Sequence, residues 1–175
     1  MASETRSHTR LPAPVLICAS VVTLGMAATV GGALAFEHIG GYIPCALCLL
    51  QRDPYYYGIP VGIAAILASA FHLPSWIARS LLALVGIMMI VGAGMGVYHA
   101  GVEWGFWEGP ATCATSSPGI TTDAGSLLDD LNAFRGPSCT QASLRILGLS
   151  FAGWNVIASL ALAAIAFFGA TRKAA

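Results

Sequence analysis

The chain has 175 residues, of which 57% are hydrophobic and only 9% are charged, and its formal net charge is zero. Soluble domains carry about 25% charged residues, so this composition excludes an ordinary soluble protein and indicates one embedded in lipid. No stretch between the apolar segments is long enough for a separate globular domain. We therefore expect residues 1–175 to form a single integral membrane domain that contacts lipid and no nucleic acid.

Four apolar segments follow one another along the chain. They cover residues 11–36, 55–71, 80–98 and 146–170, and none of them contains a charged residue. A helix needs about 20 mainly apolar residues to cross a hydrocarbon core of roughly 30 Å, and it satisfies its own backbone groups in lipid. The sequence therefore predicts an all-α membrane protein, a four-transmembrane-helix bundle with outer loops at 37–54 and 99–145.

Basic residues predict the orientation. Five lie near the two termini or in the short central loop: Arg6, Arg10, Arg79, Arg172 and Lys173. Three lie in the outer loops: Arg52, Arg135 and Arg145. Because basic residues collect on the cytoplasmic side, we expect both termini in the cytoplasm and both outer loops in the periplasm, at a bacterial inner membrane. The alternative, a cleaved secretory signal ending near Ala33-Leu34-Ala35, is disfavoured because the apolar run exceeds the usual length of a signal core.

The first outer loop holds a C-x-x-C motif, Cys45-Ala46-Leu47-Cys48. Such motifs often contain a cysteine of lowered pKa, and an exposed or strained pair tends to be catalytic rather than structural. A structural clip or half of a zinc site is the alternative for an isolated motif. The motif is therefore a candidate redox centre.

Arg52 follows four residues after Cys48, so the two side chains share a face if this stretch is helical. A cation there would stabilise a Cys48 thiolate and a negatively charged reduced acceptor; an anchor at the headgroups is the alternative. Asp53 and Pro54 resemble a helix N-cap followed by proline at the first helical position. We therefore expect a new helix to start there.

The second outer loop holds Cys113 and Cys139. In an oxidising compartment we expect two redox pairs, Cys45 with Cys48 and Cys113 with Cys139, which would form a relay if the loops meet. An all-thiolate zinc site is the alternative, but the second pair lacks C-x-x-C spacing and the compartment favours disulfides, so we expect no metal. Cys18, inside the first apolar segment, is expected to be an ordinary buried residue.

Two further features of the second loop bear on function. His99 lies at the end of the third segment, where ionisable groups are usually functional, and it is a candidate proton carrier or quinone contact, with a polar anchor as the alternative. Residues 127–134 have the apolar spacing of a short amphipathic helix, which would hold the loop on the bilayer surface. No dinucleotide fingerprint is present, so a membrane quinone is the expected electron acceptor.

Several of these motifs together resemble the DsbB family of disulfide bond formation proteins. They are Pro44-Cys45-x-x-Cys48-x-x-Gln51-Arg52, Tyr98-His99-Ala-Gly-x-Glu-Trp before Cys113, then Cys139, and Ala152-Gly153-Trp154-Asn155 in the last segment. The resemblance covers nearly the whole chain from the first segment to the fourth. It implies a membrane protein-dithiol:quinone oxidoreductase.

The resemblance also implies an electron route. A reduced, periplasmic, DsbA-like thioredoxin-fold partner would attack Cys113 of the loop disulfide, and Cys139 would then exchange with Cys45. This frees Cys48, which in the family interacts with ubiquinone or menaquinone, supported by Arg52. We expect a monomer, and Cys18 has no role in this scheme.

Three alternatives remain open at this level. A vitamin K epoxide reductase type of enzyme has similar chemistry, but its C-x-x-C follows the loop cysteines, whereas here the motif precedes them. A structural membrane protein stapled by disulfides is disfavoured because Cys45 and Cys48 would close too short a loop. A haem carrier would rest on His38, His72 and His99, yet no segment carries paired axial ligands.

Overall fold

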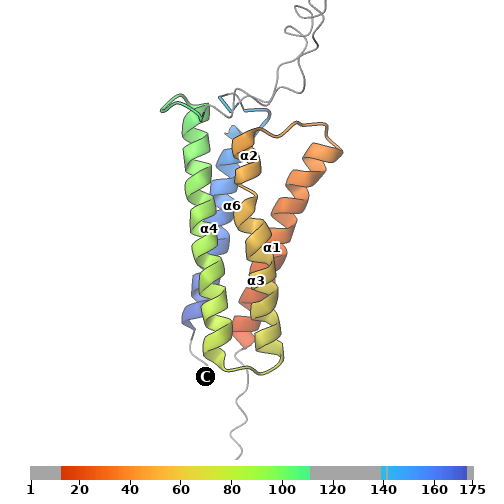
Figure 1. Cartoon of the computed structure of the whole chain (residues 1–175), viewed down its shortest axis with the longest axis vertical. Helices are drawn as coiled ribbons and strands as arrows, with labels where there is room; N and C mark the ends of the chain where they lie inside the picture. The colour runs from red at the N-terminus through yellow and green to blue at the C-terminus, as the bar shows by residue number, and fades with distance from the viewer. Residues whose placement is uncertain (1–12, 111–138, 141, 173–175) are drawn as a thin grey trace, which may run out of the picture.

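A computed structural model of the chain describes residues 13–110, 139–140 and 142–172. Its elements are α1 (Ala13–His38), α2 (Ala46–Leu50), α3 (Asp53–Ala70), α4 (Ser75–Glu103), β1 (Arg145–Ile146), β2 (Leu149–Ser150) and α6 (Phe151–Thr171) (Figure 1). Cys113 and the amphipathic helix predicted at 127–134 lie outside the described residues.

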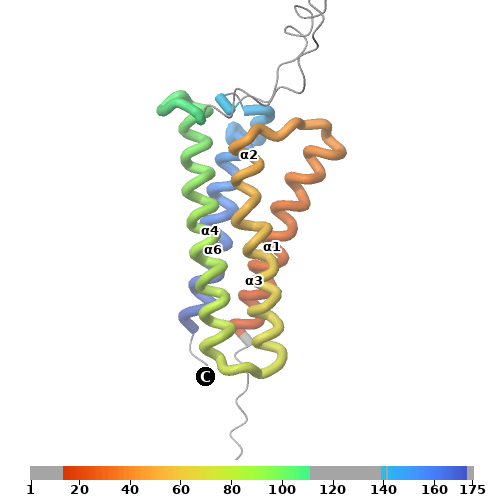
Figure 2. The backbone as a smooth tube through the Cα atoms, in the orientation of Figure 1, coloured from red at the N-terminus to blue at the C-terminus, as the bar shows by residue number. Residues whose placement is uncertain are grey.

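The long helices α1, α3, α4 and α6 run side by side (Figure 1). Helix α4 packs on α3 and α6, and α1 packs on the same two helices. The tube view shows α1 leaning away from the others at the end of the bundle that carries α2 (Figure 2). Helix α1 begins, and α6 ends, at the opposite end.

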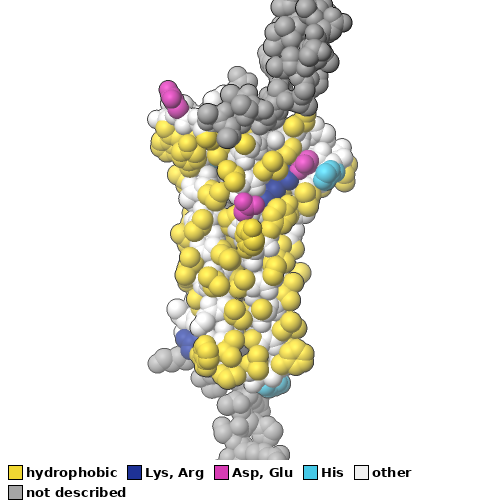
Figure 3. All heavy atoms as spheres, viewed as in Figure 1, with side chains coloured by type: hydrophobic (Ala, Val, Ile, Leu, Met, Phe, Trp, Pro, Cys, Tyr) yellow, Lys and Arg dark blue, Asp and Glu magenta, His cyan; other side chains and the backbone are white. Residues whose placement is uncertain are grey.

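Three of these helices are long and apolar enough to cross a membrane: Pro14–His38, Ser75–Glu103 and Phe151–Thr171, with mean hydropathies of 2.0, 2.2 and 1.9. Helix α3 is not among them, and its first turns carry Asp53 and three consecutive tyrosines. Hydrophobic side chains cover the flank of the bundle in Figure 3, and charged groups lie near its ends. The described helices therefore indicate a multi-pass membrane protein.

Helix α4 is longer than the apolar segment 80–98. It continues to Glu103, so His99 lies inside the helix rather than in a loop. The last helix begins only at Phe151, because residues 145–150 form a β-hairpin that pairs Arg145 with Ser150. Its turn residues, Leu147 and Gly148, have positive φ values of 53° and 83°, as in tight two-residue hairpin turns.

Small residues allow α4 and α6 to pack closely. A Cβ atom placed on Gly96 would lie 2.8 Å from Val156 Cγ2 and 3.3 Å from the carbonyl oxygen of Ala152. Helices in lipid associate through such van der Waals packing rather than through a hydrophobic driving force. The close approach holds the functional end of α4 against the start of α6.

We expect Gly96→Leu to destabilise the bundle by about 1–3 kcal/mol, the usual cost of an overpacked core. Thermal unfolding in detergent should show a lower midpoint than for the unchanged chain. Gly94→Leu is the matched control, since a Cβ there meets nothing within 4 Å. Equal midpoints for the two variants would contradict close packing at Gly96.

Candidate active site

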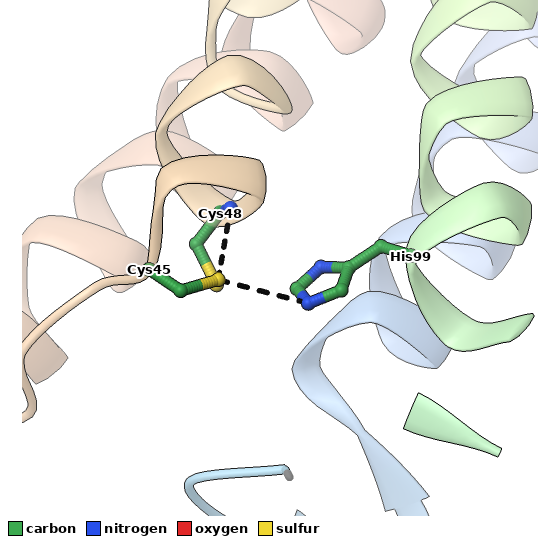
Figure 4. Close-up of side chains that lie close together, drawn as sticks. All are labelled: Cys45, Cys48 and His99. Atoms are coloured by element: carbon green, nitrogen blue, oxygen red, sulfur yellow. Dashed lines mark hydrogen bonds between the residues drawn. The ribbon is translucent and has the colours of Figure 1, made fainter. Parts of the chain in front are cut away.

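The C-x-x-C motif forms the start of the short helix α2 (Figure 4). Cys45 caps the helix, and its Sγ accepts a hydrogen bond from the backbone N–H of Cys48 at 3.3 Å. The two sulfur atoms are 2.8 Å apart and share a hydrogen bond, without a disulfide between them. Only 4% of Cys45 is exposed. The local fold thus holds both sulfurs in place for disulfide formation.

His99 reaches the pair from α4 (Figure 4). Its Nε2 atom lies 3.6 Å from Cys45 Sγ, and the residue is 3% exposed. The sequence had singled out His99 as a proton carrier or quinone contact. The structure places His99 directly beside Cys45. The two residues are far apart in the sequence, so this contact was not predicted.

A chain of hydrogen bonds leads from His99 into the bundle. Gln51 Nε2 lies 2.6 Å from His99 Nδ1, and Asn155 Nδ2 donates to Gln51 Oε1 at 2.8 Å. The Tyr55 hydroxyl donates to Asn155 Oδ1 at 2.6 Å and is 2.7 Å from Ser159 Oγ. Residues from α3, α4 and α6 are thereby tied to the site.

Cys45 also lies in a small buried cluster with Leu47, Val102 and Cys139. Cys139 is disulfide-bonded and 1% exposed, whereas its predicted partner Cys113 lies outside the described residues. A cysteine of the second loop therefore lies in the same buried cluster as the first cysteine of the motif. Because Cys139 is bonded, it is not a free thiolate for the four-cysteine zinc alternative.

On its other side the site borders a partly open cavity of about 400 Å³. Its walls are mainly apolar and come from α1, from the segment 42–55 and from the start of α6. Cys48 and His99 line this cavity, whereas Cys45 does not. The two cysteines of the motif therefore differ in one respect: both pack in or against the cluster that contains Cys139, but only Cys48 also lines the cavity.

Arg52 lines the same cavity, but its hydrogen bond goes to Glu37 Oε2, at 2.5 Å, rather than to Cys48. The prediction that Asp53 caps the next helix was wrong. The capping residue is Arg52, because the chain keeps helical dihedral angles between α2 and α3 and Asp53 already lies in the first turn.

The pKa of the Cys45 thiol lies well below its ordinary value. The largest cause is the hydrogen bond between the two side chains of Cys45 and Cys48, helped by His99 and by the Cys48 backbone N–H and opposed by burial. The pKa of Cys48 is raised by the same hydrogen bond and by burial. Cys45 is therefore the thiolate of the reduced pair.

This assignment predicts a pH dependence. The reduced chain should keep about one thiolate at pH 7 at Cys45, because a lowered pKa leaves the thiol ionised until the pH falls to that pKa. Ultraviolet thiolate absorbance measures it. Cys45→Ala should remove the signal, and Cys48→Ala should move its midpoint upward. A signal that survives in Cys45→Ala would contradict the assignment.

Other polar residues of the site were not assigned roles from the sequence. Asn155 and Ser159 lie four residues apart in an otherwise apolar helix, a pattern that marks functional polar groups in membranes. Glu103 has a side chain only 5% exposed, with Oε1 3.8 Å from His99 Nε2, and its Oε2 has no hydrogen-bond partner among the described residues. The sulfurs of Cys45 and Cys48 and a His99 nitrogen lie within 4.8 Å of one another, one ligand fewer than a structural zinc site uses.

Comparison with known proteins identifies the family. The model of disulfide bond formation protein DsbB matches residues 16–169. A disulfide bond formation protein B of Saccharophagus degradans is 29% identical over 89% of this chain and 93% of its own length. Proteins of the same name from Acidovorax sp. and Marinobacter nauticus are 31% and 27% identical, over 80% and 90% of this chain and 74% and 88% of their own lengths. No solved structure matches the chain. The chain therefore belongs to the DsbB family, which gives it a role in disulfide bond formation.

Proposed function

We propose that this protein is a membrane protein-dithiol:quinone oxidoreductase. It reoxidises a periplasmic DsbA-like dithiol protein and passes two electrons to ubiquinone or menaquinone. The observation that carries the proposal is the placement of the cysteine pair between two regions: both residues pack in or against the buried cluster that contains the loop cysteine Cys139, and Cys48 also lines the cavity. Cys45 would thus exchange with the loop disulfide, and Cys48 would contact the quinone.

The first half of the reaction is thiol–disulfide exchange. A thiolate of the partner attacks Cys113, forms a mixed disulfide, and releases Cys139 as a thiolate. Cys139 then attacks Cys45 of the Cys45–Cys48 disulfide and frees the Cys48 thiolate. The second thiol of the partner attacks the mixed disulfide, which completes the partner's own disulfide and releases Cys113. Cys113 then attacks Cys139, so that the loop disulfide forms again and Cys45 leaves as a thiolate, while Cys48 takes up a proton. The presence of Cys45 and Cys139 in one buried cluster supports this exchange, because a nucleophilic sulfur must meet the sulfur it attacks.

The cavity suits a quinone head group. Its volume, about 400 Å³, falls in the usual range of small-molecule sites, which are mainly apolar with a few placed polar groups. Here the polar groups include Cys48, Gln51, Arg52, Tyr55, His99 and Asn155, and the apolar walls come mainly from α1 and α6. A bound quinone accepts two electrons and two protons, so that partner dithiol and quinone give partner disulfide and quinol.

The membrane arrangement is part of the proposal. Helix α3 would be a fourth span between α1 and α4, although it is less apolar than the other three. Helix α1 begins and α6 ends at one end of the bundle, away from α2, which carries the C-x-x-C motif (Figure 1). This arrangement suits cytoplasmic termini and a periplasmic active site in a bacterial inner membrane. All the described side chains of the site come from one chain, which suits a monomer.

The test is a coupled assay. The purified full-length chain, in detergent, is mixed with a reduced DsbA-like protein and either a ubiquinone or a menaquinone analogue, and quinone reduction is followed by absorbance. We expect catalytic turnover that requires both substrates. Absence of quinone reduction by a chain with both disulfides formed would leave disulfides that only staple the loops as the better account.

A further inference from the structure

The orientations of two buried amides are set by backbone carbonyls. Gln51 Nε2 donates to the carbonyl oxygen of Leu47 at 3.3 Å, and Asn155 Nδ2 donates to that of Gly92 at 3.4 Å. A carbonyl oxygen only accepts hydrogen bonds, so turning either amide around would place two acceptors against each other. The direction of each bond in the chain from Tyr55 to His99 is therefore determined.

These directions determine where the His99 proton lies. Because Gln51 Nε2 is a donor, the His99 Nδ1 atom 2.6 Å away must be an acceptor. The ring is therefore neutral with its proton on Nε2, since an imidazolium would carry a proton on both nitrogens. Nε2 faces two acceptors, Cys45 Sγ at 3.6 Å and Glu103 Oε1 at 3.8 Å, which independently favours a proton there.

We propose that Gln51, Asn155 and Tyr55 are positioning residues that hold the neutral His99 ring with its Nε2–H directed at the Cys45 sulfur. Asn155 orients Gln51, and the Tyr55 hydroxyl, which lies next to Ser159, orients Asn155. The three residues touch neither sulfur in the hydrogen-bond pattern. All three also line the cavity, so their action on Cys45 through His99 is measured in the reduced chain without quinone.

The catalytic role of this hydrogen-bonded arrangement rests on the proposed function. To close the disulfide, the Cys45 thiolate forms a bond to the Cys48 sulfur while two electrons pass to the quinone. The Cys48 thiol supplies one of the two protons of the quinol, and water supplies the other. A hydrogen bond from His99 keeps Cys45 ionised for that step, and the neutral ring adds no positive charge.

Other charged and titratable groups face Cys45 and must be considered in its titration. They are Cys48 from α2, His99 and Glu103 from α4, and the disulfide-bonded Cys139. Arg52 at the start of α3 is paired with Glu37. None of these groups is altered by Tyr55→Phe, which removes one hydroxyl and keeps the ring.

Two measurements on the reduced full-length chain test the proposal, and neither needs a quinone. Nitrogen NMR of a ¹⁵N-histidine-labelled chain, assigned with His99→Asn, should show a protonated Nε2 and an unprotonated Nδ1 at His99. Gln51→Leu should weaken this preference and raise the Cys45 titration midpoint by about one pH unit, which is about a tenfold loss of thiolate at a fixed pH below the midpoint. Asn155→Leu and Tyr55→Phe should give smaller shifts, in that order.

Ser69→Ala is the matched control, because it removes a buried hydroxyl that has no hydrogen-bond partner in the described part of the chain. It should move neither signal. A proton on Nδ1 of His99, or a Gln51→Leu midpoint equal to that of Ser69→Ala, would overturn the proposal. Failure of quinone reduction would overturn the proposed function and leave both of these readouts intact, so the two failures are distinguishable.

Discussion

Cys48→Ala is expected to reduce quinone reduction to the uncatalysed background, a loss of at least about 10³-fold, as found when a covalent nucleophile is removed. Cys48 is the cysteine of the motif that lines the cavity. Without it, no sulfur of the pair faces the acceptor, and the Cys45–Cys48 disulfide cannot form. Steady-state turnover with reduced DsbA-like protein measures the loss.

Cys18→Ala provides the matched control. Cys18 is buried in the hydrophobic core, far along α1 from the site, and is a free cysteine. Its removal should leave turnover unchanged. Substantial quinone reduction by Cys48→Ala, or a comparable loss in Cys18→Ala, would contradict the assigned role of Cys48.

Arg52→Met should raise the KM for quinone by about 10- to 100-fold, because a hydrogen bond to a charged group is worth about 1.5–3 kcal/mol. Methionine keeps much of the side-chain length and removes the positive charge from the cavity wall. The first half-reaction should be unaffected, since Arg52 lines the cavity and is not part of the cluster around Cys139. Quinone titrations and quenched-flow trapping of the mixed disulfide separate the two effects.

Glu37→Gln is the control for this experiment. Glu37 holds the Arg52 guanidinium by an ion pair, and glutamine keeps its shape while Arg52 keeps its charge. We expect a smaller rise in KM than in Arg52→Met. If Arg52→Met instead slowed formation of the mixed disulfide at unchanged KM, Arg52 would act on the exchange step and not at the cavity.

The long helices could be predicted from the sequence because apolar runs of this length have few alternatives in lipid. Their exact ends could not. Helix α4 continues past Tyr98 through polar residues to Glu103, and the start of α6 is delayed by a hairpin that depends on the backbone of Leu147 and Gly148. These ends are set by hydrogen bonding that hydropathy does not report.

The cysteine motif was recognisable because its spacing is local. The surroundings of Cys45 were not, because Gln51 meets Asn155 and His99 only after three helices have packed together. Such contacts join residues far apart in the chain, and one sequence contains no record of them. Polar residues inside apolar segments were the available signal, and Asn155 was noted only as part of a motif.

The lean of α1 affects how a ligand reaches the cavity and in which units its affinity is measured. The cavity is partly open and lies between α1 and α6, two of the three described helices that are apolar enough to cross a membrane. A hydrophobic molecule entering between them is drawn from the bilayer by lateral diffusion. The concentration that decides its binding is then its mole fraction in the lipid. Adding lipid would therefore weaken binding, even when the total amounts of protein and ligand in the sample stay fixed.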